Sequence, residues 1–104
     1  MVVPEPTDEQ RAALQKAVAG RRARSALKNR FRRGGTSLRQ AMQEADTDPG
    51  LGRMRLSELL QALPEVGKLG AHDIMSELGI APTRRLGGLT DRQRTALLEK
   101  FDPA

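Results

Sequence analysis

The sequence predicts an all-α fold in which a long N-terminal helix precedes a small helical domain. Ala, Arg, Leu, Lys and Gln, which all favour helices, dominate the first third of the chain, and later apolar residues recur at helical spacing. No run of alternating β-branched residues and no Asn-Gly or Asp-Gly turn predicts a strand or hairpin. A length of 104 residues suffices for one compact domain and an appendage. We therefore expect a basic helix over residues 1–35 and a globular domain over residues 36–104.

The first helix has a start signal and a stop signal. Thr7 can cap its N-terminus while Gln10, three residues later, completes a capping box. The pair Gly34-Gly35 supplies the stop. These signals predict a helix from Asp8 to Arg33.

The apolar residues of this helix do not form one stripe. At about 100° per residue, Leu14 and Val18 fall on one side, and Leu27 and Phe31 fall on another. A helix buried along one side would keep its apolar residues in phase. We therefore expect its C-terminal half to dock through Leu27 and Phe31 while its first half projects or packs on something else.

Shorter helices are expected in the rest of the chain. Thr36 or Ser37 caps the first of them, and Thr90 with Gln93 forms a second capping box before the last. Breakers such as Pro64 separate them. The expected helices span residues 38–45, 55–63, 67–78 and 90–101. Turns are expected over residues 46–52 and 64–67, and an irregular segment over 80–89.

Composition excludes several classes of protein. The chain has no cysteine, so it can hold neither a disulfide nor a thiolate metal site. No apolar stretch approaches the roughly 18 residues of a membrane span, and the N-terminus lacks the features of a secretion signal. Only two residues are aromatic, which argues against base stacking on single-stranded nucleic acid. We expect a soluble, cytoplasmic protein that does not associate with membranes.

Positive charge is concentrated in the N-terminal third. Residues 1–35 have a net charge of +6, whereas residues 36–104 have a net charge of −1. A solvated helix face usually mixes signs, and like charges repel unless an anion answers them. Between Arg21 and Arg33 the chain has seven cations and no acid, so we predict DNA contact there, with a plain solvated helix as the alternative. The candidate DNA-binding residues of this helix are Arg21, Arg24, Lys28 and Arg32.

The segment from Leu63 to Lys68 predicts a helical hairpin. Val66 can plug the gap between its two helices, while Gly67 lets another backbone come close. The free amides of the following helical turn would then point outward beside Lys68 and form a phosphate site that reads no base sequence. A hairpin that merely packs the core is the alternative. The candidate DNA-binding residues here are Val66, Gly67, Lys68 and Gly70.

The sequence gives no sign of catalysis. His72 is the only histidine, and with Asp73 it is expected to lie on the surface of a helix. Ser57 is interpreted as a helix N-cap or a phosphate donor, not as a nucleophile. The chain has no glycine-rich phosphate loop, no metal-ligand cluster and no arrangement of nucleophile and base. We therefore expect a protein that is not an enzyme and that has no catalytic residue, metal site or cofactor.

Several segments resemble the actinobacterial integration host factor family. The likeness is carried by LPEVGKLGAHDIMSELGIAPTRRLGGL from Leu63 to Leu89 and GRMRLSELL from Gly52 to Leu60. The tail DRQRTALLEKF and the opening PTDEQRAAL fit as well, so the likeness covers nearly the whole chain. The resemblance implies a nucleoid-associated protein with a long N-terminal helix and a helix-two-turn-helix core.

The same resemblance implies a way of binding. Members of this family bind duplex DNA largely without sequence preference and bend or compact it. The resemblance also implies that the backbone-contacting positions of the globular face are Arg53, Arg55, Ser57, Gly67, Lys68, Arg84 and Arg85. The chain departs from the family at Gly70 and Gly87, where relatives often carry a basic residue, and Glu65 adds a negative charge beside Lys68.

We therefore predict a monomeric architectural protein of the nucleoid whose partner is double-stranded DNA. Chromosome compaction, gene regulation and phage site-specific integration remain open as its cellular role. One alternative is structured RNA, because the stretch from Val66 to Ile80 also looks like part of a small-subunit ribosomal protein. Another is a module that recruits a recombinase or integrase through Leu14 and Val18.

Overall fold

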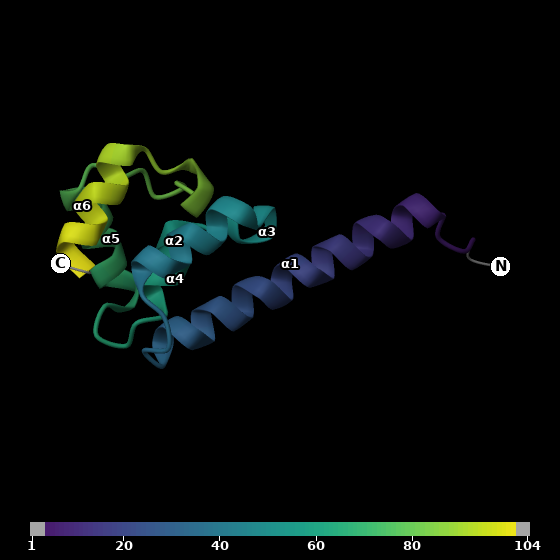
Figure 1. Cartoon of the computed structure of the whole chain (residues 1–104), viewed down its shortest axis with the longest axis horizontal. Coiled ribbons are helices and arrows are strands. Elements are labelled where there is room, and N and C mark those ends of the chain that lie inside the picture. Colours follow the sequence, from purple (N-terminus) through teal and green to yellow (C-terminus); the bar gives the residue numbers. More distant parts are fainter. Residues whose placement is uncertain (1–3, 102–104) are drawn as a thin grey trace.

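The computed structural model describes residues 4–101, and the regular elements of this range are all helical (Figure 1). They are α1 (Asp8–Arg32), α2 (Leu38–Thr47), α3 (Pro49–Gly52), α4 (Leu56–Gln61), α5 (Gly67–Glu77), the 3₁₀ turn η1 (Leu86–Gly88) and α6 (Asp91–Phe101). Within the described range, extended pairing is limited to the isolated bridge between Arg55 and Arg85. The all-α prediction is confirmed.

Helix α1 begins and ends where its capping residues predict. The Gln10 amide donates to Thr7 Oγ1 at 3.1 Å, and the Thr7 amide donates to Gln10 Oε1 at 2.8 Å, which completes the capping box. At the other end Arg33 is the C-cap, and Gly34 takes a φ of 75° that L-residues avoid. The predicted helix is therefore confirmed to within one residue at its C-terminus.

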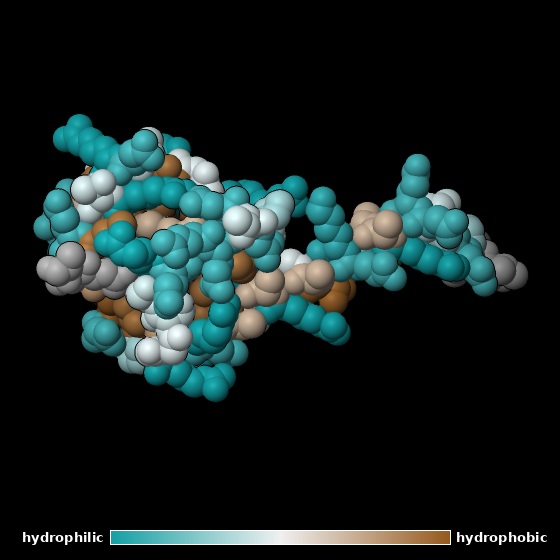
Figure 2. Space-filling model, viewed as in Figure 1, coloured by the Kyte–Doolittle hydropathy of each residue, from teal (hydrophilic) through white to brown (hydrophobic). Residues whose placement is uncertain are grey.

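Only the C-terminal part of α1 docks on the rest of the molecule. Leu27 is fully buried and Phe31 is 5% exposed, whereas Leu14 is 60% exposed. The N-terminal half stands clear of the compact remainder, which we call the body, and its visible face is mostly hydrophilic (Figures 1 and 2). This projection gives the molecule a length of 57 Å against a width of 26 Å. The expected docking through Leu27 and Phe31 is thus confirmed, while the division at residue 35 stays a prediction.

Two glycines let α1 pass close to α3. A methyl group added to Gly50 would lie 3.2 Å from the Cα atom of Gly20, so side chains larger than hydrogen would push the two helices apart. Just beyond this crossing, Arg24 Nη1 donates to the Gly50 carbonyl at 3.3 Å. The crossing therefore holds the basic part of α1 beside the body.

The prediction of a plain turn over residues 46–52 is wrong in its second half. Residues Pro49–Gly52 form the single helical turn α3, because the Asp48 carboxylate accepts the Gly50 amide at 2.9 Å and Pro49 takes the first helical position. Helix α4 is also shorter than expected and ends at Gln61. Its N-cap is Arg55, and no side chain caps it, so the interpretation of Ser57 as the cap is wrong.

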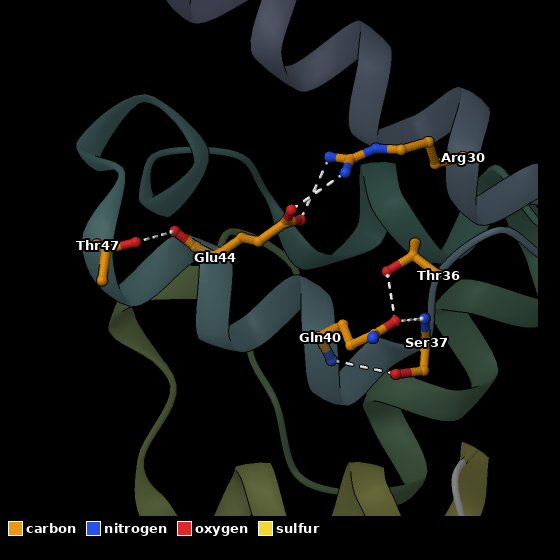
Figure 3. Close-up of polar contacts among 6 residues, drawn as sticks. All are labelled: Arg30, Thr36, Ser37, Gln40, Glu44 and Thr47. Atoms are coloured by element: carbon orange, nitrogen blue, oxygen red, sulfur yellow. Dashed lines mark hydrogen bonds and ion pairs between the residues drawn. The ribbon is translucent and has the colours of Figure 1, made fainter.

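The other two capping boxes form as predicted. Ser37, not Thr36, is the N-cap of α2, and its hydroxyl accepts the Gln40 amide at 3.1 Å (Figure 3). Thr36 instead donates its hydroxyl to Gln40 Oε1 at 3.1 Å. At α6 the Gln93 amide donates to Thr90 Oγ1 at 3.1 Å. Three local sequence signals therefore fix where α1, α2 and α6 start.

A single core unites the body. Its fully buried members include Leu56, Leu59 and Leu60 on α4, Leu86 on η1 and Leu97 on α6. Polar and charged side chains are absent from the buried set among residues 4–101. The cations of the body are therefore all on its surface or at its edge, where a ligand can reach them.

An ion pair between α2 and α6 makes stability depend on pH. Arg94 Nη1 donates to Asp46 Oδ2 at 3.1 Å, and this hydrogen bond holds the pKa of the Asp46 carboxyl below its usual value of 3.8. A depressed carboxyl pKa stabilises the fold above the unfolded pKa, and this contribution is lost as pH falls through the folded pKa. We expect Arg94→Gln to lower the Tm at pH 7, with the difference from wild type shrinking as the pH falls toward about 2. Thermal melts across this range test it, and a difference that stays constant would contradict it.

Candidate nucleic-acid interface

A short backbone pairing brings two arginines together. The Leu56 amide donates to the Arg84 carbonyl at 3.0 Å, and the Leu86 amide donates to the Met54 carbonyl at 2.9 Å. These two bonds flank the antiparallel bridge between Arg55 and Arg85. Residues opposite each other in such a pair carry their side chains on the same face. The fold thus places two guanidinium groups side by side although they are far apart in the sequence.

A groove of about 450 Å³ runs between α1 and the body, and we call it the basic groove. The arm contributes Lys16, Arg21 and Arg24 to it, and the body contributes Arg53, Arg55 and Arg85. Its remaining lining residues are Ala17, Gly20, Gly50, Met54 and Glu58. Six cations from two separate elements therefore face one common space that holds a single acid.

The charge of that acid is already matched. Glu58 Oε1 lies 2.9 Å from Lys28 Nζ, which approaches it from α1. Arg24 donates to a backbone carbonyl, as described above, and the other five groove cations make no ion pair within residues 4–101. Converging like charges raise the free energy of the molecule unless an anion lies among them. The basic groove is therefore an anion site by electrostatics.

The prediction that no acid answers the basic stretch of α1 is wrong for two of its residues. Lys28 pairs with Glu58, and Arg30 pairs with Glu44 through both guanidinium nitrogens at 3.1 and 3.3 Å (Figure 3). Lys28 does not line the basic groove, and neither does Arg32, which is exposed near the end of α1. The structure therefore brings Arg21 and Arg24 to the groove but not the other two candidates of this helix.

The turn before α5 forms the predicted hairpin, with one difference. Gly67 adopts a φ of 64°, but its amide donates to the Leu63 carbonyl at 3.1 Å, so the expectation that this amide is free is wrong. The amides of Lys68, Leu69 and Gly70 make no backbone hydrogen bond within residues 4–101. The anion-binding end of α5 therefore starts one residue later than predicted, beside the exposed Lys68 side chain.

Val66 packs against the core as the predicted plug of this hairpin. A methyl group added to Gly70 would lie 3.2 Å from Val66 Cγ1, so the space above Gly70 is already filled by that side chain. The backbone of Gly52 occupies the space at Gly87 in the same way, with its carbonyl oxygen 3.1 Å from an added methyl group. A longer side chain at either glycine would need its neighbour to move.

The two neighbouring arginines after Pro82 differ in role. Arg84 is half-buried and donates through Nη1 to the Gly88 carbonyl at 3.1 Å, while its Nε has no partner among the described residues. Arg85 is exposed and lines both the basic groove and a shallow surface shared with Arg84 and Thr83. Arg84 therefore stabilises the loop that presents Arg85.

Sequence reasoning missed one cation of the groove. Lys16 lies on the arm and lines the groove, although its stretch of helix was expected only to project or to meet another surface. The signal was present, because Lys16, Gly20 and Arg24 are spaced by four residues and share one face of α1. His72 and Asp73 are both exposed on α5, as expected.

Two searches of the described residues gave negative results. No helix within residues 4–101 is long and apolar enough to cross a membrane. The same residues contain no group of three or more histidine and acidic side chains placed to hold a metal ion.

Comparisons with known proteins match nearly the whole chain. Residues 27–101 match the family model of the S13-like H2TH domain. The chain is 64% identical to an integration host factor of Mycolicibacterium smegmatis, with 98% of each chain covered, and 43% identical to one of Streptomyces coelicolor, with 97% of this chain and 95% of that protein covered. A solved structure of sIHF bound to an 8-base-pair palindromic DNA superposes with a TM-score of 0.81. That structure is 40% identical and covers 84% of this chain and 98% of its own.

The helix-two-turn-helix body, the arm that precedes it and the full-length identity agree with one another. This chain belongs to the integration host factor family.

Proposed function

We propose that this chain binds duplex DNA through its phosphate backbone, using the basic groove and the start of α5. The observation that carries the proposal is the convergence of six cations from α1 and the body on one groove whose single acid is already paired. The relative solved with an 8-base-pair DNA supports it. The proposed DNA-contacting residues are Lys16, Arg21, Arg24, Arg53, Arg55, Ser57, Lys68 and Arg85.

The remaining sequence candidates have weaker or indirect roles. Val66, Gly67 and Gly70 shape the turn that exposes the amides of residues 68–70, and Arg84 supports the loop before η1. Lys28 is held by Glu58, and Arg32 lies outside the groove, so each can meet DNA only beyond the groove edge. We therefore place the strongest contacts where α1 meets the body.

Such a surface binds by electrostatics and not by reading bases. Arginine, lysine and free amides contact phosphate oxygens, which carry no direct sequence information. Each neutralised phosphate releases condensed counterions, and this release supplies most of the affinity. Because arm and body converge on one groove, a single duplex that contacts both must follow the angle between them. We propose DNA bending or compaction in the nucleoid as the role that follows, with no catalytic step.

The dependence of affinity on salt tests this proposal. With about six phosphate contacts, the slope of log K against log salt is expected near −5 for duplex DNA. Two duplexes of unrelated sequence should bind within a few-fold of each other at every salt concentration. Fluorescence anisotropy titrations measure both quantities. A slope near zero, or a large sequence preference at physiological salt, would contradict backbone binding.

Structured RNA is the second candidate, and the S13-like description of the matching domain is the observation that favours it. Full-length relatives named as integration host factors favour DNA. Direct competition separates the two: a DNA duplex should displace a labelled RNA hairpin at equal nucleotide concentration. Recruitment of a recombinase through Leu14 and Val18 stays a prediction, and the exposure of Leu14 is compatible with it.

A further inference from the structure

A second pocket lies on the opposite side of Arg55 from the basic groove, between α4 and α5. Its volume is about 270 Å³, and Met75, Ile80 and Pro82 give it an apolar floor. Its polar rim consists of Arg55, Ser57, Gln61, Lys68, His72 and Ser76. The pocket therefore combines an apolar surface with several hydrogen-bond donors, and we call it the α4–α5 pocket.

The rim is built from two facing helix surfaces. Lys68, His72 and Ser76 are spaced by four residues and share one face of α5, while Ser57 and Gln61 share one face of α4. None of these five side chains has a hydrogen-bond or ion-pair partner within residues 4–101. No carboxylate lines the pocket. An unoccupied set of donors with two cations and no acid favours an anionic ligand.

We propose that the α4–α5 pocket is a seat for one deoxyribose phosphate, with His72 as a contact that the sequence pattern did not suggest. Lys68 and Ser57 hold the phosphate oxygens, His72 donates a further hydrogen bond, and the sugar ring packs on the floor formed by Ile80 and Pro82. A pocket near the lower end of small-ligand sites, about 300 Å³, suits one backbone unit better than a dinucleotide. The inference rests on the proposed function, since Lys68 and Ser57 also belong to the proposed DNA surface.

His72 supplies its own probe because it is the only histidine in the chain. Its imidazole signals are therefore unique in a ¹H–¹³C NMR spectrum of the intact protein. We expect them to move on addition of a short DNA duplex and of thymidine monophosphate, and to move less with inorganic phosphate. A shift with the duplex alone identifies the backbone as the natural source, and a shift with the mononucleotide alone identifies a free nucleotide. Equal shifts with inorganic phosphate and mononucleotide would overturn the sugar contact.

Affinity measurements give an independent test. His72→Gln should weaken duplex binding about five-fold, as expected for one lost hydrogen bond. Gln43→Ala, an exposed change on α2 away from the pocket, should leave affinity unchanged. Both positions are exposed, so both variants should melt like wild type. If the wild-type protein binds duplex while the His72 signals stay still and His72→Gln binds normally, the seat is refuted and the proposed function stands. A wild-type protein that fails to bind duplex refutes both.

Discussion

Replacing Arg55 and Arg85 together with Gln should lower duplex affinity about 50-fold at about 0.1 M salt. The two guanidinium groups flank one backbone bridge and line the same groove, so their loss removes two adjacent phosphate contacts. Each contact releases about 0.9 counterion, which corresponds to roughly an eight-fold change in affinity at this salt concentration. The slope of log K against log salt should become about two units shallower. Anisotropy titrations over a range of salt measure both effects.

A variant of equal charge separates local contact from net charge. Arg92→Gln with Lys100→Gln removes two cations from α6, where neither lines the basic groove. This variant should keep the wild-type slope and lose at most a few-fold in affinity. If both double variants weaken binding equally, long-range attraction to a positive protein explains the affinity, and the groove has no special part.

Leu27→Ala should unfold the protein far more readily than the same change at Leu14. Both leucines belong to α1, but Leu27 is fully buried in the core and Leu14 is 60% exposed. Truncating a buried leucine costs about 2–5 kcal/mol of unfolding free energy, whereas surface changes stay within about 0.5 kcal/mol. In a domain of this size about 1 kcal/mol shifts the Tm by roughly 4–8 °C. Thermal melts of the two variants test the prediction directly.

The comparison is well matched because the helix, the residue type and the substitution are the same. Any loss of helix propensity is shared by both variants, since Leu and Ala both favour helices. Equal losses of stability would mean that the arm packs along its whole length, and the projecting half of α1 would then need another explanation.

Local signals predicted most of the fold. The capping boxes at Thr7, Ser37 and Thr90 depend on residues three apart, so the sequence shows both partners at once. The same holds for Gly34 and Gly79, whose positive φ values end α1 and α5. The turn α3 was missed although Asp48 followed by Pro49 is a local start signal, because the neighbouring glycines favoured an irregular turn.

The site was less accessible because its geometry depends on distant partners. The acids that pair with Lys28 and Arg30 lie 30 and 14 residues away, so the basic stretch looked unanswered in the sequence. The pairing of Arg55 with Arg85 needs the backbone bonds between residues 54–56 and 84–86, which no short motif announces. The crossing of Gly20 and Gly50 aligns Lys16 with the body, and this too follows only from packing.

The position of bound DNA is the most direct test that the groove between arm and body holds the duplex. The chain has no cysteine, so single changes such as Ala17→Cys in the groove and Thr95→Cys on α6 can each carry one tethered iron–EDTA group. Hydroxyl radicals from the group at position 17 should cleave an end-labelled duplex strongly, and those from position 95 should cleave it no more than free reagent does. Strong cleavage from position 95 with none from position 17 would contradict the account.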